Sequence, residues 1–241
     1  MPPVQQLHLR AGSLVAKFKQ GEGTSHIDEA ISLDREALEL CPPGHPKRTV
    51  CLACLGIHLG DRSSRLGATS DLEEAIVVIR EALDIFPAGN PDRSMSLNAL
   101  AVCLCLRYSR LGGIEDFDEA IVLDREALDL RPHGHPNRPS SLIYLSSHLS
   151  SPYNEFGAMG DLDEAIVLLR EALACRPQGH PDRIVVLNIL GSCLSIRYER
   201  LGGMEDLDEA IILFQEALDL RPQGHPLRSG ALDILSYCLS A

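Results

Sequence analysis

The chain repeats itself every 45 residues, and this period constrains its fold more than any other feature of the sequence. Each repeat carries Glu-Ala-Ile, Glu-Ala-Leu, a proline, a Gly-(His/Asn)-Pro loop and an arginine in the same order. A repeat of this size cannot bury its apolar face alone, so the sequence predicts an array in which each repeat packs on its neighbours. The spacing holds without insertion, as the first glutamates show: Glu29, Glu74, Glu119, Glu164 and Glu209.

Each repeat is predicted to form two helices. In the second repeat, Pro46 fits a first helical position, leucines then recur at helical spacing, and Gly67 fits a left-handed C-cap. Asp71 and Glu74 resemble a capping box at the start of the second helix. The sequence contains no strand-like alternation of polar and apolar residues. The expected fold class is therefore all-α.

The second helix of each repeat resembles that of a tetratricopeptide repeat (TPR). Ala75 and Ala82 lie seven residues apart and Pro87 follows five later, which is similar to the TPR pattern, and Leu190-Gly191 resembles its first helix. The Gly179–Asp182 loop is similar to the longer linker of kinesin-light-chain-type repeats and of fungal TPR arrays that precede a caspase-like peptidase domain. The resemblance implies a right-handed superhelical solenoid of helical hairpins. The first helix is longer than in the minimal motif, and the motif's usual tryptophan is missing.

We expect residues 1–241 to form a single TPR-like solenoid with a 45-residue period. Pro152 stands inside the expected first helix of the fourth repeat, so a bend or an early stop is predicted near Ser150. The expected hairpins are 3–41, 46–86, 91–131, 136–176 and 181–221, each of two helices, and a lone helix over 226–240 ends the chain.

Two columns of repeated residues contain metal-ligating side chains, and we interpret both as structural. A histidine in the loop column is replaced by Asn90 in one repeat, which favours a loop cap over a metal ligand, and zinc would need ligands much closer together than neighbouring repeats place them. The mid-helix column alternates histidine and cysteine, and buried cysteine is common as a small apolar residue. The first column is His45, His135, His180 and His225, and the second is His58, Cys103, His148, Cys193 and Cys238.

Two charged columns are also assigned to structure. Glu36 and Arg48 recur in all five repeats, which indicates an ion pair between one helix and the start of the next. A basic stripe either docks an acidic ligand or pairs with the acidic residues that open the second helices, and we favour pairing. The stripe is Lys17, Arg62, Arg65, Arg107, Arg110, Arg197 and Arg200, and the acidic residues are Asp71, Asp116 and Asp206.

Catalytic and cofactor motifs are missing from the sequence. No glycine pattern fits a phosphate or dinucleotide loop, and no Ser/His/Asp set stands apart from the repeat columns. We therefore expect no enzyme activity, no cofactor and no bound metal.

Composition excludes two classes of partner. The 34 acidic residues outnumber the 22 basic ones, for a net charge of −12, and only 4% of residues are aromatic. The chain lacks the basic patch and stacking surface of nucleic-acid binders and the polybasic surface that anionic membranes attract. It shows no secretory signal and no spanning segment. Eight cysteines without such a signal indicate a reducing compartment, and we expect the cytoplasm.

The TPR resemblance implies that the first helices line a concave, partner-binding surface. The columns expected there hold no lysine or arginine, which argues against the basic clamp that binds acidic chaperone tails. Small, apolar and amide side chains suit an extended segment or a helix. The candidate residues are Val50, Ala53, Ile57, Met95, Asn98, Val102, Ser140, Ile143, Ser147, Val185, Asn188 and Ser192.

These observations favour a non-catalytic scaffold that binds a peptide or helix of another protein on its concave face. The alternative is a regulatory or oligomerisation segment of a larger multidomain protein, for example one with a caspase-like peptidase domain, whose effector domain lies outside this sequence. End-to-end self-association is a further alternative, because Leu7, Val15 and Phe18 at the start and the apolar residues of the last helix are expected to lack a covering repeat.

Overall fold

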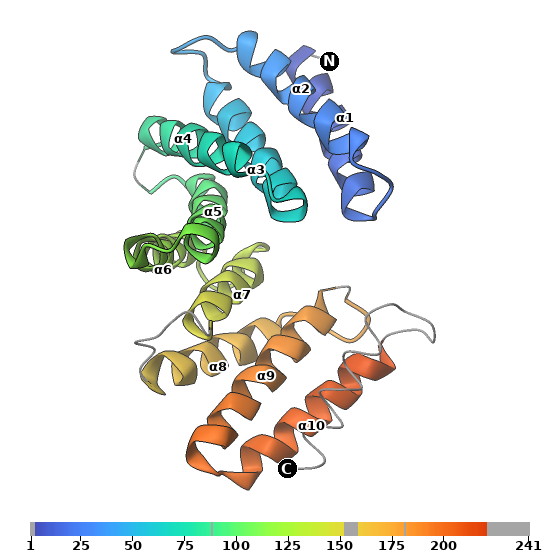
Figure 1. The fold of residues 1–241 in the computed structure, drawn as a ribbon, viewed down its shortest axis with the longest axis vertical. Coiled ribbons are helices and arrows are strands. Elements are labelled where there is room, and N and C mark those ends of the chain that lie inside the picture. Colours follow the sequence, from blue (N-terminus) through green and yellow to red (C-terminus); the bar gives the residue numbers. More distant parts are fainter. Residues whose placement is uncertain (1–2, 88, 152–158, 181, 221–241) are drawn as a thin grey trace. The chain divides into compact units, whose positions relative to one another are not determined.

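The computed structural model describes residues 3–87, 89–151, 159–180 and 182–220. Within these ranges the chain is all helical and has no strand, which confirms the predicted fold class (Figure 1). The helices are α1 (Pro3–Lys19), α2 (Ser25–Glu39), α3 (Arg48–Leu66), α4 (Thr69–Ile85), α5 (Arg93–Leu111), α6 (Ile114–Asp129), α7 (Arg138–Leu149), α8 (Met159–Ala174), α9 (Arg183–Leu201) and α10 (Met204–Asp219).

The chain divides into two compact units, residues 1–131 and residues 132–241. Unit 1 contains α1 to α6, and unit 2 contains α7 to α10. In both units consecutive helices pair as hairpins, α1 with α2 through α9 with α10. Hairpins then stack within a unit, because α2 packs on α3, α4 on α5, and α8 on α9. One continuous solenoid over 1–241 stays a prediction, and the expected lone helix 226–240 lies outside the described residues.

Helix boundaries differ from the expected ones at two places in the second repeat. The helix α3 begins at Arg48 rather than at Pro46, because the loop forms a turn in which the backbone N–H of Arg48 donates to the carbonyl of His45 at 3.0 Å. The capping box is wrong: α4 begins at Thr69, and Asp71 lies inside its first turn. The left-handed cap is confirmed, since Gly67 has φ 78° and its N–H donates to Ser63.

The fourth repeat departs from the others as expected. Its first helix, α7, ends at Leu149, and the backbone N–H of Ser150 donates to the carbonyl of Ser146 at 3.0 Å. The predicted early stop near Ser150 is therefore confirmed, and Pro152 itself lies outside the described residues.

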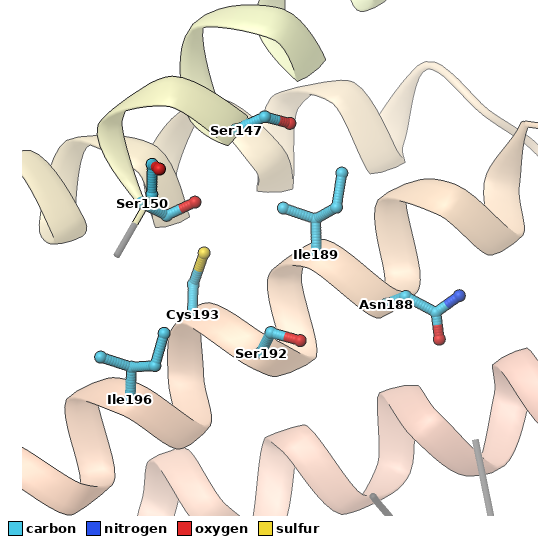
Figure 2. Close-up of a pocket in the computed structure, with 8 residues that line it drawn as sticks. Ser147, Ser150, Asn188, Ile189, Ser192, Cys193 and Ile196 are labelled. Atoms are coloured by element: carbon cyan, nitrogen blue, oxygen red, sulfur yellow. The ribbon is translucent and has the colours of Figure 1, made fainter. Parts of the chain in front are cut away.

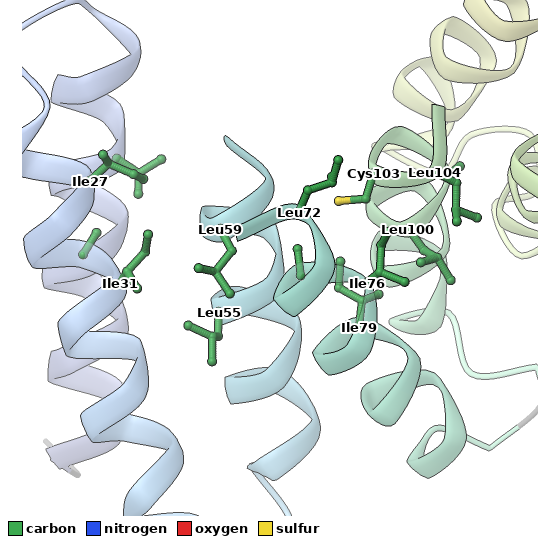
Figure 3. Packing of buried hydrophobic residues seen from close by; sticks show 14 of the residues in the cluster. Ile27, Ile31, Leu55, Leu59, Leu72, Ile76, Ile79, Leu100, Cys103 and Leu104 are labelled. Carbon is green, nitrogen blue, oxygen red and sulfur yellow. The ribbon is translucent and has the colours of Figure 1, made fainter. Parts of the chain in front are cut away.

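The core of unit 1 is a continuous layer of aliphatic side chains between the stacked hairpins. Figure 3 shows Ile27 and Ile31 of α2 facing Leu55 and Leu59 of α3, and all four are at most 2% exposed. Full burial of such a side chain contributes about 1.5–3 kcal/mol. The expectation that the start of the chain leaves apolar residues uncovered is wrong for Phe18, which is 3% exposed, and for Val15, which is also buried.

Two glycines let helices within one hairpin approach closely. A Cβ added at Gly56 of α3 would lie 2.3 Å from Cγ1 of Ile79, and one at Gly191 of α9 would lie 2.8 Å from the ring of Phe214. Real Cβ atoms do not sit so close to other atoms. The large side chain of the second helix therefore fills the space that glycine leaves in the first.

The arginines that share one repeat position of the basic stripe, Arg62, Arg107 and Arg197, each hold three helices together. Arg62 of α3 bonds both carboxylate oxygens of Asp71 in α4, at 2.6 and 2.8 Å, and also reaches Asp28 in α2 at 2.7 Å. Structural pairing of the stripe is thus confirmed at these positions. The same bidentate bond recurs from Arg107 to Asp116 and from Arg197 to Asp206.

The second charged column is structural, and the structure identifies the partner that the sequence left open. Arg48 pairs with Glu81, 33 residues ahead in the second helix of its own hairpin, with its Nη2 at 2.7 Å from the carboxylate. It also donates to the carbonyl of Cys41 at 3.0 Å and so ties the preceding helix to the next hairpin. Sequence spacing alone did not distinguish Glu36 from Glu81, because both belong to the same column.

The clamp in unit 2 predicts an acid-dependent loss of stability. Arg197 holds the pKa of Asp206 below its ordinary value of 3.8. A carboxyl whose pKa is lower in the folded state stabilises that state above its unfolded pKa, and the contribution is lost as pH falls through the folded pKa. We expect Arg197→Gln to lower the free energy of unfolding at neutral pH, and the difference from wild type to shrink as pH falls below 3.8. Urea unfolding across that range measures the difference, and a constant difference would contradict this assignment.

Candidate partner-binding site

The predicted binding residues lie on the first helices α3, α5, α7 and α9, and most of them reach the surface. Two are buried, Ala53 and Asn98. The exposed members are Val50, Met95, Val185 and Ser192, and the partly buried ones are Ile57, Val102, Ser140, Ile143, Ser147 and Asn188.

Asn98 is not available to a ligand, which corrects its place in the predicted site. It is 4% exposed, and its side-chain amide donates to the buried carboxylate of Asp124 at 2.7 Å. Its side-chain oxygen accepts from Arg131 at 3.1 Å, and Arg131 also donates to the hydroxyl of Ser94. Asn98 therefore belongs to a buried polar network between α5 and α6. Ala53 is 1% exposed and packs in the core, so it too is removed from the site.

Unit 2 contains a hollow between its two first helices, α7 and α9. Its volume is about 330 Å³. In Figure 2, Ser147 of α7 and Ser150, which directly follows that helix, face Ile189, Cys193 and Ile196 of α9 across it. Three predicted binding residues line the hollow: Ser147, Asn188 and Ser192.

The two units differ in residue type at a position that lines the hollow. In unit 1, α3 and α5 contact each other, and a Cβ added at Gly60 would lie 3.0 Å from the sulfur of Cys103. Unit 2 has Ser150 at the position of Gly60 and Cys193 at that of Cys103. Both Ser150 and Cys193 line the hollow.

The wall of the hollow is uncharged and mostly apolar. Its polar groups bond partly to their own helices: the hydroxyls of Ser147 and Ser150 donate to the carbonyls four residues earlier, both at 2.8 Å. The side-chain amide of Asn188 donates in the same way to Ile184. Burial raises the pKa of the Cys193 thiol, although the hydroxyl of Ser150 opposes that shift. A neutral thiol suits contact with an apolar side chain and not nucleophilic chemistry.

The loop histidines bond the backbone of their own loop, which fits the structural role expected for them. The Nδ1 of His45 accepts from the backbone N–H of Lys47 at 3.1 Å, and Asn90 makes the same bond through its Oδ1 at 2.9 Å. His135 and His180 repeat it. Among the described residues, no group of three or more His, Cys, Asp or Glu side chains could hold a metal ion. No helix in the described ranges is long and apolar enough to cross a membrane.

His58 was expected to be a packing residue, and it instead forms a polar pair. Its Nδ1 lies 2.5 Å from Oδ2 of Asp34, which is fully buried in α2. The other carboxylate oxygen of Asp34 has no hydrogen-bond partner in the part of the chain that the structure describes. Cys103 and Cys193, in the same column as His58, are 2% and 1% exposed and pack as predicted. The signal missed was the Asp34 column, which holds Asp124 in the third repeat and apolar Ile79, Leu169 and Phe214 in the others.

Comparison with known proteins identifies the fold. No family model matches the chain, and no curated protein matches it. A crystal structure from Podosopora anserina, titled as a putative kinesin light chain with nearly identical TPR-like repeats, has a TM-score of 0.58 and 18% identity over 88% of this chain and 97% of that chain. A substituted variant of that protein has the same TM-score and identity. A thermophilic TPR protein of Thermus thermophilus has a TM-score of 0.61 and 17% identity over 99% of this chain and 100% of its own.

These likenesses show that the chain has a TPR-like helical repeat fold. The family resemblance drawn from the alanine and proline pattern of the second helices is thereby confirmed. At 17–18% identity this structural similarity shows the fold but does not indicate a ligand.

Proposed function

We propose that the chain is a protein-binding scaffold that holds a peptide or a helix of a partner on its first helices. The hollow between α7 and α9 carries the proposal, because an uncharged recess of about 330 Å³ can take an apolar side chain of a bound segment. The exposed Val185 extends the apolar surface along α9. Interfaces of this kind draw much of their affinity from a few buried anchors.

The nature of the partner follows from charge and composition. An acidic chain with a net charge of −12 does not favour nucleic acid or anionic membranes, so we propose a protein partner. Under this proposal the chain binds without catalysing, and it acts in the cytoplasm, where its buried cysteines stay reduced.

The proposal predicts that Ser192→Arg weakens peptide binding at least tenfold. Ser192 is exposed and lines the hollow, so an arginine there places a charge and a long side chain in the recess. The matched control is Ile212→Arg, which changes a side chain that is 63% exposed on the second helix α10. A random peptide library displayed on phage is panned against the wild-type chain and both variants.

We expect selected peptides to bind the wild type and Ile212→Arg and to lose at least tenfold in affinity for Ser192→Arg. A tenfold loss corresponds to about 1.4 kcal/mol. If Ile212→Arg alone weakened peptide binding, the binding site would lie on the second helices instead. Failure to select any peptide would also contradict the proposal.

A further inference from the structure

Equivalent positions at the contacts between hairpins differ in polarity. The contact of α2 with α3 carries the pair Asp34 and His58, joined at 2.5 Å. The corresponding positions in α4 and α5 hold Ile79 and Cys103, which are 0% and 2% exposed. In α8 and α9 they hold Leu169 and Cys193, which are 0% and 1% exposed. In the sequence the aspartate and the histidine recur at positions 124 and 148, and Asp124 accepts a hydrogen bond from Asn98 of its own hairpin at 2.7 Å.

We propose that these positions form a recognition code that decides which hairpin can dock on which. A second helix with aspartate at the Asp34 position accepts a first helix with histidine at the His58 position. A second helix with isoleucine or leucine there accepts cysteine. The repeats are otherwise very similar in sequence. Little else would therefore prevent a hairpin of this chain, or of a second copy, from docking one repeat out of register.

The physical basis is the cost of a mismatched pair. Asp34 is fully buried and one of its oxygens already lacks a partner, so within the described ranges only His58 satisfies its carboxylate. Opposite a cysteine, the carboxylate would lose its hydrogen-bond partner. A histidine opposite Ile79 would likewise lose the partner of the ring nitrogen that now bonds Asp34. A buried polar group that is left unsatisfied destabilises the fold by its desolvation penalty. Polar groups of this kind are best attested as devices that set register.

The constant period allows a direct test in the full chain. One copy of residues 46–90 is inserted between Asn90 and Pro91, where the repeated loop makes the junction natural. The histidine of the copy then faces Ile79, which is a mismatch. A matched control carries His58→Cys in the copy only and so restores the isoleucine–cysteine pair. An added repeat with good contacts should raise stability by a nearest-neighbour term.

We expect the cysteine insertion to be more stable than the natural chain, and the histidine insertion to have a folding equilibrium constant roughly 5- to 150-fold lower than the cysteine insertion, the range for an unsatisfied buried group. Chemical unfolding followed by circular dichroism measures both. Equal stability of the two insertions would overturn the proposal.

A second variant tests whether the two facing positions select each other or whether one position only tolerates different side chains. Ile79→Asp should destabilise the cysteine insertion, because the new carboxylate faces a thiol. The same substitution should stabilise the histidine insertion, because it creates an aspartate–histidine pair. This reversal of sign is not expected of a residue that only packs. The same sign in both backgrounds would show that polarity at these positions does not select the docking hairpin.

Discussion

Replacing His58 with cysteine is expected to lower the free energy of unfolding of unit 1 by about 1–3 kcal/mol, the cost of leaving a buried polar group without its hydrogen-bond partner. Cysteine is the residue that the next repeat uses at this position, so the substitution is small and compatible with the helix. The loss arises because Asp34 is 0% exposed and would keep its carboxylate without the imidazole that now lies 2.5 Å away. Equilibrium unfolding in urea, followed by helical circular dichroism, measures the change.

The double variant Asp34→Ile/His58→Cys is the control. It copies the pair that the chain already uses at Ile79 and Cys103, so it removes the buried carboxyl group together with its partner. Replacing both partners of a buried hydrogen bond by apolar groups can be nearly neutral or stabilising. We therefore expect the double variant to be at least as stable as the wild type. If the single variant were as stable as the double one, Asp34 would not depend on His58.

Substituting alanine for Gly56 is the second large effect. The new Cβ would sit 2.3 Å from Cγ1 of Ile79, so α3 and α4 must move apart or Ile79 must leave its rotamer. Overpacking of this kind costs about 1–3 kcal/mol. We expect the midpoint of chemical unfolding to fall accordingly.

Gly12→Ala provides the matched control for the Gly56 prediction. Gly12 lies in α1, is exposed, and would present its Cβ to open space. Alanine favours a helix interior over glycine by about 0.5–1 kcal/mol. The same substitution should therefore stabilise unit 1 at Gly12 and destabilise it at Gly56. A gain in stability at both sites would mean that α3 and α4 are not closely packed at Gly56.

Much of the fold follows from the period of the sequence. The hairpins, the glycine cap at Gly67 and the early end of α7 at Leu149 all depend on local patterns that recur or visibly fail to recur. Local signals were weaker where several loop residues compete for a helix start. That is why Pro46 lies in a turn before α3 and Asp71 lies inside the first turn of α4.

The candidate site was less predictable, because it depends on what one repeat places opposite another. Asn98 shares a column with the partly exposed Ile143 and Asn188, but its amide donates to the buried carboxylate of Asp124 and so lies in the interior. The hollow lies where serine replaces Gly60, a difference that no single repeat reveals. The Asp34–His58 pair was likewise visible only by comparing two columns at once.

The most direct test of the proposed scaffold is to locate a selected peptide on the chain by methyl NMR. Isoleucine and valine methyl groups are labelled, and intermolecular contacts from the bound peptide are recorded. The account predicts contacts to Ile189 and Ile196, which line the hollow between α7 and α9. Contacts instead to Val167 and Ile212, which are exposed on the second helices α8 and α10, would contradict it.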